Sequence, residues 1–158
     1  MSDLEKIAAQ VAEKLIARRE KIAVSESSSG GLISAALLAV PGASAYYLGG
    51  AVVYTARARA ALVGIERGDV EGMRSASEPY AQLLARRTRE LMRATWGIAE
   101  IGAAGPTANP YGDAAGHTVV AVSGPTNLVR TIETGSPDRR ANMDVFAAAA
   151  LELLLEAL

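Results

Sequence analysis

Apolar residues recur every three or four positions over residues 3–19, with charged residues between them. This spacing predicts an amphipathic helix. Further helices are predicted, from helical spacing and from helix start and stop residues, at about 30–40, 55–63, 77–95 and 138–157. Short apolar runs bounded by glycine, proline and small polar residues predict strands at 22–26, 48–54, 98–102, 117–123 and 128–133. Residues 65–77 are polar and irregular, with room for one short helical turn.

The order of these elements indicates the fold class. Strands alternate with helices over the first hundred residues, and residues 124–127 (Gly-Pro-Thr-Asn) predict a hairpin turn between the last two strands. We therefore expect an α/β fold, a three-layer α/β/α sandwich whose five-stranded sheet is mostly parallel with one antiparallel strand. No linker, internal repeat or low-complexity segment interrupts the chain, so residues 1–158 are predicted to form a single domain.

Composition narrows the possible chemistry. The chain contains no cysteine and one histidine, His117, which excludes disulfides, thiolate metal sites, a cysteine nucleophile and a His-rich metal site. A formal net charge of −1 provides no field that would recruit nucleic acid or an anionic membrane. No apolar run is long enough to span a bilayer, and the charged start lacks the apolar segment of a signal peptide. We expect a cytoplasmic protein with no metal, no cofactor and neither nucleic acid nor membrane as a partner.

Small polar residues and glycines follow three of the predicted strands. Residues 25–31 lie between the first strand and the next helix, where free backbone N–H groups and a helix N-terminus suit an anion or a developing oxyanion. Similar loops occur at 54–59 and 102–107. Because the carboxyl ends of parallel strands share one edge of a sheet, the three loops are predicted to converge on a ligand site. The long segment 107–116 is typical of a functional or mobile loop.

The ordered set of short motifs resembles the CinA C-terminal domain family over essentially the whole chain. These motifs are Glu26-Ser27-Ser28-Ser29-Gly30-Gly31, Pro41-Gly42-Ala43-Ser44, Gly49-Gly50-Ala51-Val52-Val53-Tyr54-Thr55, Leu62-Val63-Gly64-Ile65, Ser77-Glu78-Pro79, Gly102-Ala103-Ala104-Gly105-Pro106, Gly116 and Asp138-Arg139. The resemblance implies a three-layer α/β/α domain, often oligomeric. Characterised members are nicotinamide-nucleotide amidohydrolases, which convert nicotinamide mononucleotide and water to nicotinic acid mononucleotide and ammonia.

The resemblance also implies three catalytic positions. The first serine of the motif, here Ser27, acts as nucleophile in the family, supported by a tyrosine at the end of the second strand, here Tyr54, and by a lysine five residues later. Arg59 stands at that lysine position, and a guanidinium cannot act as a base near neutral pH. Ser28 and Ser29 replace the family's cysteine and threonine. Ala56 replaces an asparagine and Ile101 a hydroxyl residue, so several positions around the site differ together.

Nine further residues are candidates for substrate binding. They are Glu26, Ser28, Ser29, Gly30, Gly31, Gly102, Gly105, His117 and Arg139. Glu26 either orients hydroxyls and backbone N–H groups in the loop or caps the following helix. His117 is either a substitute base or phosphate ligand, or a histidine at a strand end with no role in chemistry. Arg139 either meets a phosphate or lies in the first turn of a surface helix.

Three functional hypotheses follow. The first is an amidohydrolase that acts on a pyridine nucleotide, with Ser27 as nucleophile and the N–H groups of Gly30 and Gly31 assisting the oxyanion or phosphate. The second is a family member that binds a nucleotide without turnover, because arginine replaces lysine at position 59. The third is a structural domain that serves only to oligomerise. A homo-oligomer is expected in each case, and a small-molecule pyridine nucleotide in the first two.

Overall fold

The computed structural model describes residues 1–158 and confirms the order of the predicted elements. Its helices and strands are α1 (Asp3–Arg18), β1 (Ile22–Glu26), α2 (Leu32–Leu38), β2 (Tyr47–Val52), α3 (Ala56–Val63), α4 (Glu78–Met92), β3 (Trp96–Ala103), β4 (His117–Ser123), β5 (Leu128–Glu133) and α5 (Arg139–Ala157). Short 3₁₀ turns occur at Ala43–Ala45 and Arg67–Val70. The predicted bounds of β1, β4 and β5 hold residue for residue, and the other elements shift by a few residues at their ends.

The five strands form one sheet in the order β2-β1-β3-β4-β5. β1 pairs in parallel with both β2 and β3, whereas β4 pairs antiparallel with both β3 and β5. Four strands therefore run in one direction and only β4 runs against them, as expected. The description "mostly parallel" is only partly right, because two of the four pairings are antiparallel. The reason is that β4 is joined to both neighbours by hairpin connections rather than by crossover helices.

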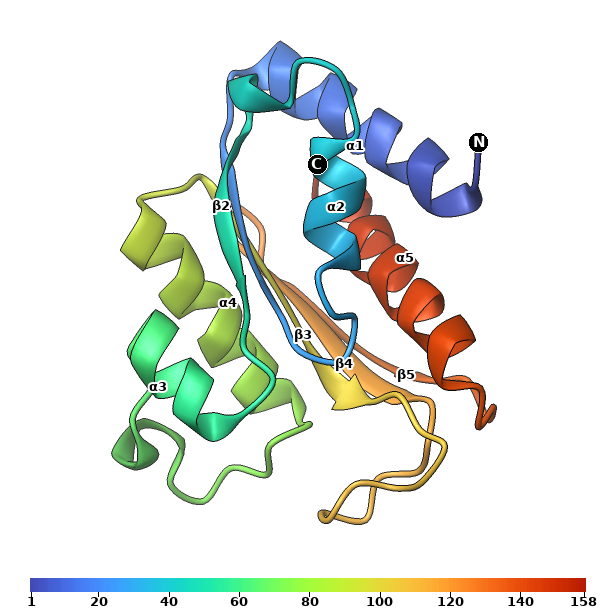
Figure 1. Cartoon of the computed structure of the whole chain (residues 1–158). Coiled ribbons are helices and arrows are strands. Elements are labelled where there is room, and N and C mark those ends of the chain that lie inside the picture. Colours follow the sequence, from blue (N-terminus) through green and yellow to red (C-terminus); the bar gives the residue numbers. More distant parts are fainter.

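Helices cover both faces of the sheet and make three layers (Figure 1). α1, α2 and α5 pack on one face, and α3 and α4 pack on the other. Each face has its own apolar core, a larger one of 19 buried residues beneath α1, α2 and α5 and a smaller one of 12 beneath α3 and α4. The expected three-layer sandwich is confirmed.

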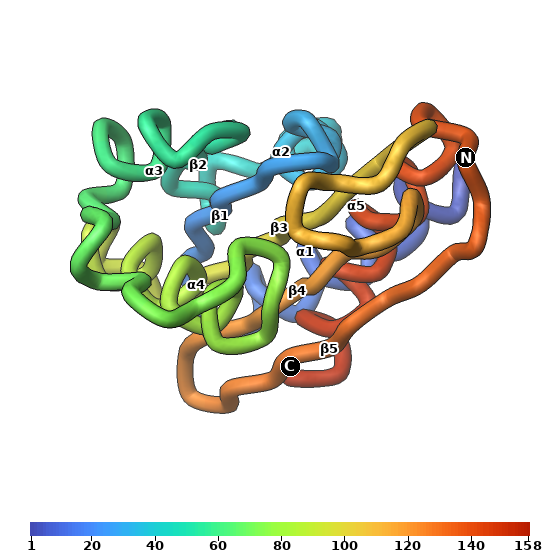
Figure 2. Tube along the Cα trace, turned by 90° about the horizontal axis from the view of Figure 1, so that it is seen from below, coloured from blue at the N-terminus to red at the C-terminus, as the bar shows by residue number.

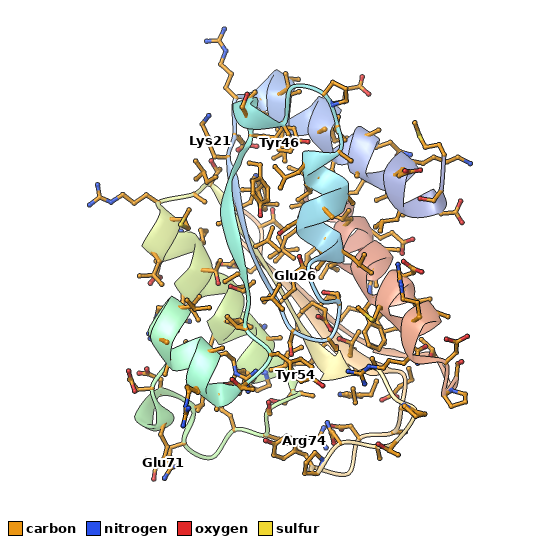
Figure 3. All side chains as sticks on the ribbon, viewed as in Figure 1. Lys21, Glu26, Tyr46, Tyr54, Glu71 and Arg74 are labelled. Carbon is orange, nitrogen blue, oxygen red and sulfur yellow. The ribbon has the colours of Figure 1, made fainter.

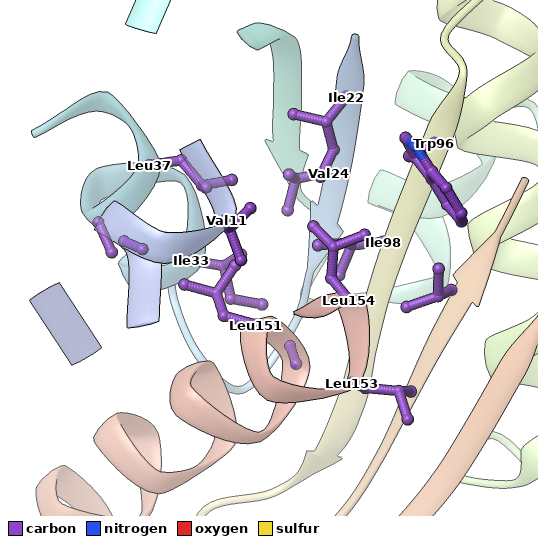
Figure 4. Packing of buried hydrophobic residues seen from close by; sticks show 14 of the residues in the cluster. Val11, Ile22, Val24, Ile33, Leu37, Trp96, Ile98, Leu151, Leu153 and Leu154 are labelled. Atoms are coloured by element: carbon purple, nitrogen blue, oxygen red, sulfur yellow. The ribbon is translucent and has the colours of Figure 1, made fainter. Parts of the chain in front are cut away.

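Strand alternation divides the side chains between these cores. Ile22 and Val24 of β1, with Trp96 and Ile98 of β3, point into the larger core (Figure 4). Successive strand residues point to opposite faces, so residues two positions apart lie on the same face. Two positions after Val24 in β1 comes Glu26, and two positions after Ile98 in β3 comes Glu100.

Two local predictions have different outcomes. The glycines of β2 were expected to permit close approach of a neighbouring backbone, and a Cβ on Gly50 would lie 2.6 Å from the carbonyl oxygen of Val24, which confirms it. Ser77 was expected to cap α4 and does occupy the N-cap position, but its side chain makes no capping hydrogen bond. The Ser77 hydroxyl donates instead to the carbonyl of Arg74, which precedes the helix.

The carboxyl ends of β1, β2 and β3 meet at one edge of the sheet, which faces the viewer in Figure 2. The segment between α3 and α4 and the connection between β3 and β4 both run across this edge. The three small-residue loops therefore share an edge, as the sequence predicted. None of the helices combines the length and apolar character needed to cross a membrane.

Candidate functional site

Two buried glutamates lie side by side at this edge. Glu26 and Glu100 are register partners on β1 and β3, and they are 1% and 0% exposed. Neither forms a salt bridge with a basic side chain of the protein. Buried carboxylates without cationic partners need hydrogen-bond donors, and here the serine-glycine loop supplies them.

Glu26 caps the helix that follows the loop. Its carboxylate accepts hydrogen bonds from the backbone N–H groups of Gly31 (3.1 Å), Ile33 (3.0 Å) and Ser34 (2.9 Å), and from the Ser29 hydroxyl (2.7 Å). Figure 3 shows Glu26 at the end of β1, beside the start of α2. The protein's own carboxylate thus occupies the N-terminus of α2, where the macrodipole favours negative charge. The prediction that the N-terminus of this helix would be free to bind an external anion was wrong.

Glu100 holds the other side of the loop. It accepts from the backbone N–H groups of Ser27 (3.1 Å) and Ser29 (2.8 Å) and from the hydroxyls of Ser28 and Thr118, and it shares the Ser29 hydroxyl proton with Glu26. Sequence reasoning assigned no role to Glu100 or Thr118. The only sign of the former was a carboxylate inside an apolar strand, a position that demands partners.

The two glycines of the loop do not present their N–H groups to a ligand. Gly30 donates to the carbonyl of Ser27 and Gly31 donates to Glu26, which corrects the expectation that both would assist an oxyanion or phosphate. Both have positive φ angles, +65° and +101°, so glycine is required by the turn itself. The Ser28 N–H and the Ser27 hydroxyl make no hydrogen bond within the protein. They are the loop's uncommitted polar groups.

A cleft of about 240 Å³ brings the three predicted catalytic residues together. Ser27, Tyr54 and Arg59 line it, with Ile101 and Gly102 at its β3 wall. Ser27 is 4% exposed, whereas Tyr54 is 57% exposed at the end of β2 (Figure 3). No lysine lines this cleft, and the Ser27 hydroxyl has no acidic or basic side chain within hydrogen-bonding distance.

Arg59 is 6% exposed and is held by two hydrogen bonds. Its Nε donates to the Tyr80 hydroxyl (2.8 Å) and its Nη1 to the carbonyl of Val53 (2.9 Å). The guanidinium carbon also lies 5.3 Å from the centre of the Tyr80 ring, within cation–π range. Arg59 is not hydrogen-bonded to Tyr54 or Ser27, so it is fixed in place by α4 and the β2 end rather than by its catalytic neighbours.

A second cleft of about 210 Å³ adjoins the first and shares Tyr54 and Gly102 with it. Gly105 and Arg139 line this second cleft. Arg139, in the first turn of α5, donates from Nη1 to the Gly105 carbonyl and from Nη2 to the Tyr54 hydroxyl (3.2 Å). It therefore joins the ends of β2, β3 and α5 around one polar hollow.

Hydrogen bonds and one ion pair fix the loop after β3, whose Asn109 lines both clefts. Asn109 and Asp113 exchange side-chain and backbone hydrogen bonds, and Arg74 pairs with Asp113 at 3.1 Å. Asn142 of α5, 1% exposed, donates to the carbonyls of Ala104 and Ser136. The loop predicted to be functional or mobile is thus tied to both neighbouring segments.

His117 does not reach either cleft. Its Nδ1 bonds the Glu133 carboxylate and its Nε2 bonds the Ala76 carbonyl (2.8 Å), with Asp113 3.6 Å away. Burial alone lowers the pKa of His117, but these hydrogen bonds and the acidic neighbours raise it above its usual value overall. Both ring nitrogens face acceptors, so the imidazolium form suits the site, and His117 has a structural setting rather than that of a base.

Gly102 also has a packing reason. A Cβ at this position would lie 2.3 Å from the His117 carbonyl oxygen on the paired strand β4. Gly105 has a φ of +103° where the chain leaves β3. Gly102 lines both clefts and Gly105 lines the second, and the backbone geometry by itself requires glycine at both positions.

Comparison with known proteins decides the family. Residues 4–158 match the model of the CinA C-terminal domain. The chain belongs to the CinA C-terminal domain family. It is 37% identical over 149 residues to a CinA-like protein of Anaeromyxobacter sp. and 36% identical over 156 residues to one of Myxococcus xanthus. These alignments cover 93% and 96% of the chain but 36% of each relative, so the chain spans about a third of their length.

Solved structures of the same superfamily share the fold. A competence/damage inducible protein of Agrobacterium tumefaciens has a TM-score of 0.91 at 25% identity, covering 99% of this chain and 96% of that chain. A CinA superfamily protein of Escherichia coli has a TM-score of 0.91 at 25% identity, covering 100% and 94%. The sequence-based assignment to the family is confirmed.

Proposed function

We propose that this domain binds a nicotinamide nucleotide across the two clefts and hydrolyses its carboxamide slowly, with Ser27 as the nucleophile. Membership of a family that includes nicotinamide-nucleotide amidohydrolases supports the substrate class. The observation that carries the proposal is an uncommitted Ser27 hydroxyl at the wall of the first cleft, followed in the chain by an uncommitted Ser28 N–H. A nucleophile followed by a free backbone donor is the minimum required for attack on a carbonyl.

The two clefts divide the ligand between them. The carboxamide lies beside Ser27, and the phosphate lies beside Arg139, whose guanidinium keeps three of its five N–H groups free after its two hydrogen bonds. Tyr54 lines both clefts, so it separates the reacting group from the anchoring group. Ser27 attacks the carboxamide carbon, ammonia leaves, and water hydrolyses the ester to give the acid and free serine.

Turnover is slow because nothing beside Ser27 takes its proton. Arg59 remains charged at neutral pH, and His117 is outside the clefts. A positioned general base typically contributes 10²–10⁴-fold to such a step. The same observation favours a second candidate function, a domain that binds the nucleotide without any turnover.

Measurement of ammonia release distinguishes slow hydrolysis from nucleotide binding without turnover. Purified protein is incubated with nicotinamide mononucleotide, and ammonia is measured against the Ser27→Ala variant. We expect slow release that disappears in Ser27→Ala and rises by about 10²–10⁴-fold in Arg59→Lys, in which a neutral lysine supplies the base. Equal release from wild type and Ser27→Ala contradicts the hydrolase proposal and leaves nucleotide binding as the function.

A further inference from the structure

Arg59 is a buried cation without a counter-ion. It is 94% removed from solvent, yet no carboxylate of the protein lies within 4.0 Å of it. Its two hydrogen-bond partners are neutral, a tyrosine hydroxyl and a backbone carbonyl. A buried charge that lacks a partner is costly, so the missing charge is expected to come from outside the chain.

Arg59 lines the first cleft and keeps three N–H groups that no group of the protein accepts. Two of its five N–H groups are used, which leaves one on Nη1 and both on Nη2. No fully enclosed side-chain nitrogen in the protein lacks a partner, so Nη2, which has none, is not fully enclosed, and Arg59 is a wall residue of the first cleft. The guanidinium thus keeps uncommitted N–H groups on both Nη1 and Nη2 beside the cleft that Arg59 lines.

This end of a guanidinium matches a carboxylate. Parallel N–H groups on Nη1 and Nη2 pair with the two carboxylate oxygens in a bidentate, charge-assisted arrangement. A neutral carboxamide offers one acceptor oxygen and turns an N–H₂ group towards a donor-only surface. The hydrogen bonds to Tyr80 and Val53 hold the guanidinium still, so little side-chain freedom is lost on binding.

We propose that Arg59 makes the first cleft an acceptor for carboxylates, so that this domain holds the pyridine carboxylic acid nucleotide more tightly than the amide. The ligand's identity as a pyridine nucleotide rests on the proposed function, whereas the preference for the acid rests on the unpartnered guanidinium. The hydrolysis product therefore stays bound, and the domain serves as a receptor for the acid form even where turnover is slow.

Binding of the two nucleotides tests this preference. Isothermal titration calorimetry at pH 7.5 compares nicotinamide mononucleotide with nicotinic acid mononucleotide, in Ser27→Ala so that neither is converted. We expect the acid to bind at least about tenfold more tightly, because one charged hydrogen-bonded pair contributes enough binding free energy for a difference of that size. Adding Arg59→Gln brings the two dissociation constants within about twofold. Adding Arg57→Gln, an exposed arginine on the same helix outside the cleft, leaves the ratio unchanged.

Three outcomes overturn the proposal. The first is equal affinity for the acid and the amide when Arg59 is present. This comparison needs no variant at position 59, so it decides the question even if Arg59→Gln fails to fold. Equal weakening of both nucleotides by Arg59→Gln assigns Arg59 to the shared phosphate instead, and absence of binding by either nucleotide removes the site. An acid preference without ammonia release would contradict the proposed hydrolysis and leave this inference standing. Ammonia release without an acid preference would contradict this inference and leave the proposed hydrolysis standing.

Discussion

The inner and outer sides of the serine-glycine loop differ in how their polar groups are satisfied. On the inner side, Glu26 and Glu100 are the acceptors for eight donor groups of the loop, α2 and β4, and the Ser29 hydroxyl lies within hydrogen-bonding distance of both carboxylates. On the outer side, Ser27, Arg59 and Arg139 line clefts with donors left over. The inner groups hold the backbone, and the outer groups are free for a ligand. Substitutions on the two sides should therefore change different properties.

Removal of an inner carboxylate gives the largest expected loss of stability. Glu100→Ala leaves the buried N–H groups of Ser27 and Ser29 and the hydroxyls of Ser28 and Thr118 without their acceptor, whereas the Ser29 hydroxyl keeps Glu26. Each buried donor without a partner costs about 1–3 kcal/mol, so we expect a loss of about 3–5 kcal/mol in the free energy of unfolding. Urea denaturation measures it, with the exposed Glu71→Ala as control (Figure 3). A loss below about 1 kcal/mol would contradict the structural role of Glu100.

Substitution of Ser27 and of Ser29 compares the outer and inner sides of the loop directly. The Ser29 hydroxyl contacts both glutamates, at 2.7 and 2.8 Å, whereas the Ser27 hydroxyl contacts neither. Ser29→Ala should lower the free energy of unfolding by about 1–3 kcal/mol. Ser27→Ala should change it by less than about 0.5 kcal/mol and abolish ammonia release. Equal destabilisation by the two would show that the loop has no distinct outer side.

His117 gives a smaller effect that depends on pH. Its pKa is raised in the folded protein, so its contribution to stability is full below the unfolded value of about 6.5 and is lost as pH rises through the folded pKa. The stability difference between wild type and His117→Gln should therefore shrink between pH 6 and pH 9. Denaturation at several pH values measures it. A difference that grows with pH would show that the imidazole is held neutral.

The sequence predicted the element order because hydrophobic spacing and turn residues are local properties. It also indicated that the loops 25–31 and 54–59 are neighbours, since strand ends meet at one edge, and the family resemblance singled out Ser27, Tyr54 and Arg59 within them. It missed Glu100, because an isolated carboxylate in an apolar strand does not reveal which donors will surround it. For the same reason the predicted hydrogen-bond acceptors of the Gly30 and Gly31 N–H groups were wrong. The partners that hold His117 outside the clefts lie 41 positions before it and 16 after it in the sequence, so local patterns do not reveal them.

Neighbouring arginines on α5 test most directly whether the outer side is a nucleotide site. Arg139 lines the second cleft, whereas Arg140 is paired with Asp144 at 2.8 Å on the exposed surface. Calorimetry with nicotinamide mononucleotide should show binding that weakens about tenfold or more in Arg139→Gln and is unchanged in Arg140→Gln. Equal affinities for wild type and Arg139→Gln, or no binding to the wild-type domain, would contradict the account.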